Sequence, residues 1–330
     1  MQKNDFFQLE LPELENTCLH SRYMISLGYD DFYSQIMSTP AFQRLGDISF
    51  LGAIDYLPEY KLIRRKLKTR KNHSLSVAAL AKLVAQRRNY SQELTKHLVV
   101  AGLVHDIGHP PLSHSVEPFL KAHFGYGHHE MGEIVLEGKV KIGKELNEII
   151  SKNLDLVFLK RLIDGKASVI DGGDLFSSKI NLDTIDGIIR SNRYLNGKSF
   201  SLSVTQVALA SFTNEIEKKT VVLDNFWLLK DRVYNLLITS GNGLNADVKS
   251  RIGFEQGKLK LSESLLFTTE KSWHQIYPLI FDTIRATSND KCDISGVLEV
   301  VKRKYHINKN ETRHSKRYLY TKEKKSVYLN

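Results

Sequence analysis

Apolar residues recur at helical spacing through most of the first 240 positions of this 330-residue chain. The first clear stripe consists of His73, Val77, Leu80 and Val84. These positions lie at i, i+4, i+7 and i+11, which places them on one face of a helix. We predict a helix that is capped by Asn72 or Ser74 and runs to about Gln86.

A second stripe ends in an unusually polar pair. Its inner positions are Leu94, Leu98, Ala101 and Val104. Ser91 is the predicted N-cap, Gly108 ends the helix, and the two prolines at 110 and 111 prevent its continuation. The adjacent His105 and Asp106 therefore lie in the last turn of a buried helix, where they suit a metal site better than a core.

Further helices are predicted along the next hundred residues. Their expected ranges are 113–123, 129–136, a helix capped by Asn181, and 204–238. In the Asn181 helix, Asp183, Asp186 and Arg190 share one face, and isoleucines form the other. Beyond residue 250 the pattern weakens, with possible short strands at 258–261 and 325–329. We predict a mainly α fold: a helical domain over 1–250 and a smaller, irregular or mixed extension over 251–330.

The composition is that of a soluble globular protein, with 42% hydrophobic and 25% charged residues. No apolar run approaches the roughly 18 residues of a membrane span, so we expect no membrane partner. The N-terminus has no apolar signal core, and the two cysteines, Cys18 and Cys292, lack metal or disulfide spacing. We expect a cytoplasmic location.

The net charge of +10 is concentrated in two segments. Residues 302–325 contain ten Lys or Arg and two Glu, with tyrosines interleaved. This basic segment could contact nucleic acid, or it could be a solvated, partly disordered tail. A second run, residues 61–71, has seven basic residues and no acid, and it leads directly into His73. It could face phosphate or form a solvated surface.

Carboxylates and neutral imidazoles suit a divalent cation used in phosphate chemistry. Such groups stand near the apolar faces of three predicted helices, at His73, at His105 with Asp106, and at Asp183. Each residue alone is a weak signal, because a buried histidine is usually a hydrogen-bonded core residue. The ordered set His…His-Asp…Asp is far more specific, and it is the signature of the HD superfamily of metal-dependent phosphohydrolases.

Within that superfamily the sequence resembles the deoxynucleoside triphosphate triphosphohydrolases, which include the bacterial dGTPases. The segments that carry the likeness are 39–45 (TPAFQRL), 70–75 (RKNHSL), 101–114 (AGLVHDIGHPPLSH), 129–130 (HE) and 181–186 (NLDTID). The match covers residues 38–240 and nothing beyond about 250. The resemblance implies an HD-domain helical fold.

The resemblance also implies roles for individual residues. The implied metal ligands are His73, His105, Asp106 and Asp183. The implied catalytic residues are His109, His129 and Glu117, where Glu117 orients a histidine. The implied substrate contacts are Arg70 and His114 at phosphate and Tyr234 at the sugar, and we add Asp186 to this group. His128 is expected to be a bystander.

Several positions depart from the family pattern. The family has a sugar-reading glutamine, a sugar-packing tyrosine and a 3′-hydroxyl-binding aspartate where this chain has Phe50, Gly187 and Ser191. A phosphate-holding lysine and arginine correspond to Thr184 and Phe226. The resemblance therefore implies the reaction class more firmly than the substrate.

Three functions remain open. The first is hydrolysis of (deoxy)nucleoside triphosphates to nucleoside and triphosphate, with a divalent metal such as Mn, Mg, Fe, Ni or Co. The second is a metal-dependent nuclease acting on single strands or phosphodiester ends. The third is a nucleotide-sensing module without turnover. We expect a nucleotide partner and, from the resemblance, a homo-oligomer.

Overall fold

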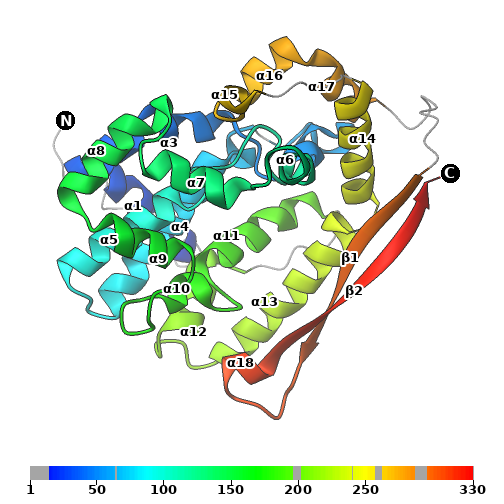
Figure 1. Cartoon of the computed structure of the whole chain (residues 1–330). Coiled ribbons are helices and arrows are strands. Elements are labelled where there is room, and N and C mark those ends of the chain that lie inside the picture. The colour runs from blue at the N-terminus through cyan, green and yellow to red at the C-terminus, as the bar shows by residue number, and fades with distance from the viewer. Residues whose placement is uncertain are drawn as a thin grey trace.

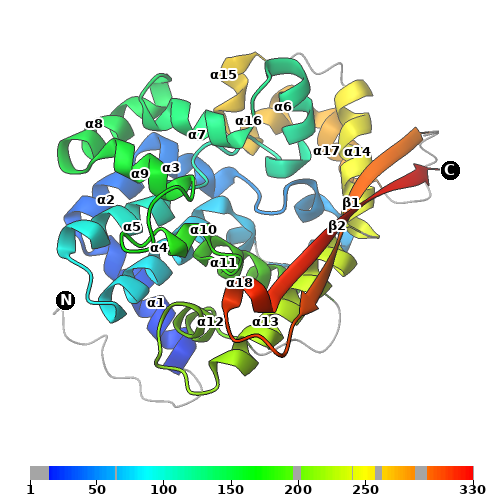
Figure 2. The same cartoon turned by 60° about the horizontal axis from the view of Figure 1, so that its bottom comes forward.

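The computed structural model describes residues 15–63, 65–195, 202–239, 241–256, 262–286 and 296–329. Helices form most of this part of the chain, and its named strands make one antiparallel hairpin near the C-terminus (Figure 1, Figure 2). The predicted mainly α fold with a smaller mixed C-terminal part is confirmed. The predicted strand at 258–261 lies outside the described residues.

The elements follow one another with short connections. The helices of the first half are α1 (Glu15–Gly28), α2 (Asp31–Ser38), α3 (Pro40–Arg44), α4 (Arg70–Arg87), α5 (Gln92–Val104), α6 (Glu117–Phe124), α7 (His128–Leu136), α8 (Lys144–Asn153) and α9 (Leu156–Ile163). Those of the second half are α10 (Asp174–Ser177), α11 (Leu182–Ser191), α12 (Val204–Phe212), α13 (Lys219–Val233), α14 (Asn242–Gln256), α15 (Glu263–Leu266), α16 (Glu270–Ile276), α17 (Pro278–Arg285) and α18 (His314–Arg317). The hairpin consists of β1 (Gly296–Ile307) and β2 (Tyr318–Leu329).

Helices α4 and α5 lie at the centre of the helical core, and α1, α11 and α12 pack around α4. The two central helices approach closely at Gly102, where a Cβ atom would lie 2.7 Å from the Cα of Ala78. Any larger residue there would push the helices apart. This close contact places the start of α4 beside the end of α5, and so brings His73 near His105.

Helix caps agree with the sequence in two places out of three. Ser91 and Asn181 cap α5 and α11 through their side-chain oxygens, as predicted. Helix α4 is instead capped by Thr69, whose hydroxyl accepts a hydrogen bond from the amide of Asn72 at 3.3 Å. The predicted caps Asn72 and Ser74 are wrong, because the helix begins at Arg70 and both residues lie inside its first turns.

The loop after α5 is held rigidly from two sides. Buried Arg44 donates hydrogen bonds to the carbonyls of Ile107 and His109 at 2.7 and 2.8 Å. The neighbouring Gly108 lies against α7, where a Cβ atom would be 2.1 Å from the carbonyl oxygen of His128. Only glycine fits this approach, which brings the start of α7 next to the metal-ligand segment.

The C-terminal hairpin lies along α13 and reaches α14 (Figure 1, Figure 2). The ring of Trp227 on α13 contacts Tyr305 and Tyr318, with ring centroids 5.2 and 5.3 Å apart. Arg317 pairs with Asp224 of the same helix at 2.6 Å. The expectation of a partly disordered tail is wrong for residues 296–329, because these tyrosines and Arg317 dock the segment onto α13.

None of the helices in the described ranges is long and apolar enough to cross a lipid bilayer.

Candidate metal centre

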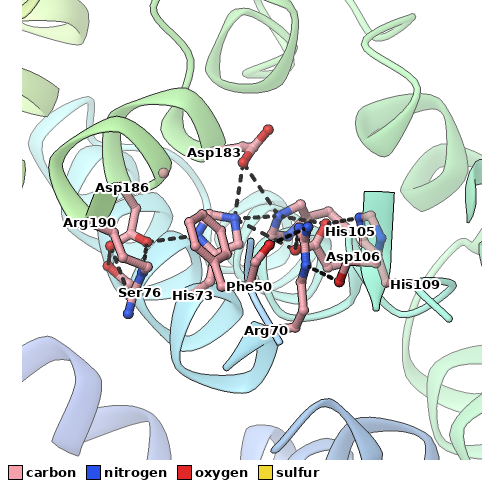
Figure 3. A network of polar contacts seen from close by, with 12 residues as sticks. Phe50, Arg70, His73, Ser76, His105, Asp106, His109, Asp183, Asp186 and Arg190 are labelled. Atoms are coloured by element: carbon pink, nitrogen blue, oxygen red, sulfur yellow. Dashed lines mark hydrogen bonds and ion pairs between the residues drawn. The ribbon is translucent and has the colours of Figure 1, made fainter. Parts of the chain in front are cut away.

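Four side chains from three helices converge at one point (Figure 3). His73 stands in the first turn of α4, His105 and Asp106 directly follow α5, and Asp183 stands in the first turn of α11. His73 Nε2 lies 3.2 Å from His105 Nε2 and 3.0 Å from Asp183 Oδ1. The Asp106 carboxylate lies 3.5 Å from His105 Nε2 and 3.7 Å from His73 Nε2. These are the four residues that the sequence predicted as ligands.

Hydrogen bonds on the far side of each imidazole fix its tautomer. His105 Nδ1 lies 2.9 Å from the carbonyl oxygen of Gly102, and His73 Nδ1 lies 2.6 Å from Asp186 Oδ2. A carbonyl and a carboxylate can only accept, so both Nδ1 atoms carry a proton. In the neutral rings the two Nε2 lone pairs therefore face each other and the carboxylate oxygens of Asp106 and Asp183.

Such a cluster of acceptors repels itself unless a positive charge lies between its members. Two imidazole nitrogens and two carboxylates are also the donor types that bind first-row divalent cations. The residues present therefore fit a divalent metal ion, as the sequence predicted. In the absence of metal a proton takes its place: burial lowers the pKa of His73, but hydrogen bonds from Asp183 and Asp186 outweigh burial and raise the pKa to about 9.

Asp186 supports the site from behind. It is 4% exposed, it accepts hydrogen bonds from Ser76 and from Arg190 at 2.7 Å, and it does not line the cavity. The sequence assigned it to substrate contact, but the structure places it against His73 instead. Carboxylates in this position orient a metal-binding histidine and increase its basicity.

Arg70 is equally committed to the protein. Its Nη1, Nε and Nη2 donate to Asp106 Oδ2 at 2.8 Å, to Ser113 Oγ at 3.1 Å and to the carbonyl of Phe50 at 2.8 Å. Burial raises the pKa of Asp106, but Arg70 and the flanking histidines hold it well below its usual range. The Asp106 carboxylate is therefore charged and fixed in place.

A cavity of about 640 Å³ opens over the four ligands. Among the predicted residues, those that line it are Arg70, His105, Asp106, His109, His114, His129, Asp183 and Tyr234. His73 is completely buried, and Glu117 lies behind the lining histidines. The cavity wall also includes Phe50, Thr184, Gly187 and Ser191, the positions that depart from the family pattern. Phe226, the fifth such position, is fully buried away from it.

A second cluster of histidines lies beside the ligands. Glu117 accepts from His114 Nδ1 at 3.1 Å and from His128 Nδ1 at 2.9 Å. The rings of His128 and His109 stack with centroids 4.1 Å apart, and His109 Nε2 lies 3.3 Å from Asp106 Oδ1. Burial lowers the pKa of His114, while Glu117 acts to raise it. Burial likewise lowers the pKa of His129.

Two residues of the site were missed by the sequence reasoning. His128 was expected to be a bystander, but it shares Glu117 with His114 and stacks on His109. The only available signal was its position beside His129 at the start of a helix. Arg303, from β1, lines the same cavity, with its guanidinium carbon 4.3 Å from the centre of the Tyr234 ring. Nothing in the sequence connects this residue with the ligands, since it lies 120 positions beyond Asp183.

The comparisons with known proteins agree with this geometry. Residues 70–171 match the family model of the HD domain, and this stretch contains the first three proposed ligands. HD domains are metal-dependent phosphohydrolases, and the resemblance noted in the sequence is thus supported independently.

Curated relatives are similar over longer stretches. An uncharacterized protein of Methanocaldococcus jannaschii is 28% identical over 186 residues, which are 56% of this chain and 35% of the relative. The deoxynucleoside triphosphate triphosphohydrolase SAMHD1 homolog of Dictyostelium discoideum is 25% identical over 247 residues, 70% of this chain and 44% of the relative. A deoxyguanosinetriphosphate triphosphohydrolase-like protein of Rhodopseudomonas palustris is 38% identical over 65 residues, 18% of this chain and 15% of the relative. The chain thus spans less than half the length of each of these relatives.

Proposed function

We propose that this protein is a metal-dependent phosphohydrolase that cleaves (deoxy)nucleoside triphosphates to a nucleoside and triphosphate. The observation that carries the proposal is the convergence of two Nε2 lone pairs and two carboxylates on one point at the floor of a large cavity. A divalent cation held there would neutralise phosphate charge and lower the pKa of water toward neutrality. The similarity to the triphosphohydrolase relatives supports the substrate class.

The chain's own residues then divide the remaining work. Asp186 and the carbonyl of Gly102 keep the Nδ1 protons of His73 and His105 away from the ligand point. Asp106, fixed by Arg70, keeps its charge directed at the same point. These groups are preorganised, so little reorganisation is needed when substrate binds.

Proton transfer falls to the histidine cluster. His109 and His129 line the cavity as proposed acids, and the structure adds His114 and His128 through their shared partner Glu117. A carboxylate behind an imidazole stabilises its protonated form, so a ring bonded to Glu117 is well suited to give a proton to the leaving oxygen. Buried His109, beside Asp106 and Arg70, is better suited to donate a hydrogen bond as a neutral ring.

The test is a substrate panel with product identification. Purified protein is incubated with Mn²⁺ or Mg²⁺ and each NTP and dNTP, and products are identified by mass. Triphosphate and nucleoside in equal amounts are expected, and they should be absent from the His105→Ala variant. If no nucleotide is hydrolysed with any of the metals, the proposal fails.

A nuclease acting on single strands is the second candidate. It is favoured by the hairpin that borders the cavity, whose exposed lysines at 304, 322, 324 and 325 could follow a phosphate backbone. Labelled oligonucleotides belong in the same panel. Mononucleotide products that disappear in the His105→Ala variant and at high salt would favour this candidate.

A further inference from the structure

Arg303 occupies an unusual position on the C-terminal hairpin. Along β1, exposed residues alternate with residues that face the helices, as in any strand with one covered face. Tyr305 and Ile307 on the covered face pack against the hydrophobic core. Arg303 is on that same face and is half-buried, where an aliphatic or aromatic residue would be expected.

The guanidinium of Arg303 has no acidic partner among the residues that the structure describes. No printed ion pair includes it, and its partner across the hairpin is Lys322, which has the same charge. Like charges directly opposite each other on a sheet destabilise it. A half-buried cation without a counter-ion, beside another cation, is unfavourable unless an anion binds to it.

The surroundings of Arg303 show where that anion would lie. Its guanidinium carbon is 4.3 Å from the centre of the Tyr234 ring, and both residues line the cavity that contains Asp183 and Thr184. Stacking on an aromatic ring uses the flat face of a guanidinium and leaves its N–H groups free to donate in the plane. Of the lysines and arginines in the cavity wall, the other one is Arg70, which already donates to Asp106, Ser113 and Phe50.

We propose that Arg303 is a substrate-binding residue, which holds oxygens of the nucleotide's phosphate chain from the side of the cavity opposite Arg70. This inference rests on the proposed function for the identity of the substrate. It assigns to the C-terminal hairpin a part in substrate specificity: the helices supply the metal ligands, and β1 supplies the free cation. Tyr234 then acts as the support that fixes the guanidinium plane, and only its remaining surface is open to a sugar.

The test compares Arg303→Ala and Arg303→Lys with Lys304→Ala, which removes one charge from the next position on the outer face. Lys304 has a 67% exposed side chain, and its ammonium lies 3.6 Å from Glu323. Two quantities are measured on the full chain: binding of inorganic tripolyphosphate by calorimetry with Mg²⁺ in excess, and steady-state kinetics with the best nucleotide of the panel.

Arg303→Ala is expected to weaken tripolyphosphate binding and raise KM by about 10- to 100-fold, since that is the usual value of a charge-assisted contact. The kcat should change little. Arg303→Lys should lie between alanine and wild type, because it keeps the charge and loses the planar fork. Lys304→Ala should match wild type.

Equal behaviour of Arg303→Ala and Lys304→Ala would overturn the assignment, and so would a wild-type protein that does not bind tripolyphosphate. If Arg303→Ala does not fold, the lysine variant decides, with its thermal unfolding as the check. Binding that depends on Arg303 in a protein that hydrolyses no nucleotide would overturn the proposed activity and leave the anion site standing.

Discussion

The metal centre and the hairpin wall form two sides of one cavity, but they are built in different ways. The ligands come from helices whose caps and close contacts are local: Thr69 starts α4, Gly102 sets the α4–α5 distance, and Asn181 starts α11. Arg303 reaches the same cavity because a distant hairpin docks on α13. One side is fixed by buried hydrogen bonds, whereas the other depends on tertiary contacts along a single helix. The two sides should therefore respond separately to mutation.

The largest effect is expected on the helical side. His105→Ala removes one ligand nitrogen and should reduce hydrolysis by at least about 10³-fold, because several kcal/mol of charge stabilisation depend on the cation. Asp183→Asn should behave in the same way with less risk to folding, since the Asp183 side chain is 53% exposed. Metal content by mass spectrometry and activity are measured together.

His123→Ala is the matched control for these variants, because His123 is an exposed histidine on α6 outside the cavity wall. It should keep its full metal content and activity. A His105→Ala protein that retains both would show that the converging side chains are not a metal site.

A smaller loss of about 10²-fold in kcat is expected for Glu117→Gln, because Glu117 orients two histidines without touching the metal ligands. The pH profile gives a second readout. Burial lowers the pKa of His114 and Glu117 raises it, so removal of the carboxylate should lower that pKa further. The limb of the profile that His114 controls should move to lower pH.

Glu148→Gln, on the exposed surface of α8, is the control for loss of a charge alone. A Glu117→Gln protein with reduced kcat and an unshifted profile would mean that Glu117 acts only on folding or packing.

Asp186→Asn should weaken metal binding by about 10-fold, which is the usual effect of changing a carboxylate behind a metal-binding histidine. Asparagine keeps the shape of Asp186 near Arg190 but removes the charge that supports His73 Nδ1. Activity should recover at saturating metal, in contrast to Asp183→Asn. Failure to recover would place Asp186 in direct contact with substrate, which was the sequence-based assignment.

The same contrast explains how far the sequence could lead. The ligands of the metal centre were predictable because each lies at a helix end that is marked by its own cap or breaker, such as Ser91 and Gly108. The role of Asp186 was not, because spacing places it on the same helix face as Asp183 but does not distinguish a residue in the cavity from one behind it. Only packing against Ser76 and His73 makes that distinction.

The hairpin was beyond sequence reasoning for a different reason. The tyrosines of residues 302–325 suggested a surface for nucleic acid, yet Tyr305 and Tyr318 contact Trp227 of α13. Their partner lies about 80 residues earlier in the chain, and periodicity carries no information over such a separation. Long-range docking of this kind is visible only in the folded chain.

The smallest effect is expected from loosening that dock. Asp224 accepts hydrogen bonds from Arg317 and from Tyr318 at 2.9 Å, so Asp224→Asn should destabilise the hairpin by about 2 kcal/mol. It should raise KM a few-fold, because Arg303 is held less firmly, and leave metal content unchanged. Unchanged metal content with raised KM would show that the two sides of the cavity are separable, whereas loss of metal would show that the hairpin also supports the helices.

Acidification should produce the same loosening in the wild type. Burial raises the pKa of Asp224, but the hydrogen bonds from Arg317 and Tyr318 outweigh burial and lower it. A carboxyl group with a lowered pKa stabilises the fold above its unfolded pKa of about 4, and this stabilisation is lost as the pH falls through the folded pKa. The difference in Tm between wild type and Asp224→Asn should thus be full at neutral pH and shrink below about pH 4. A difference that is constant with pH would mean that the carboxylate charge of Asp224 does not hold the hairpin.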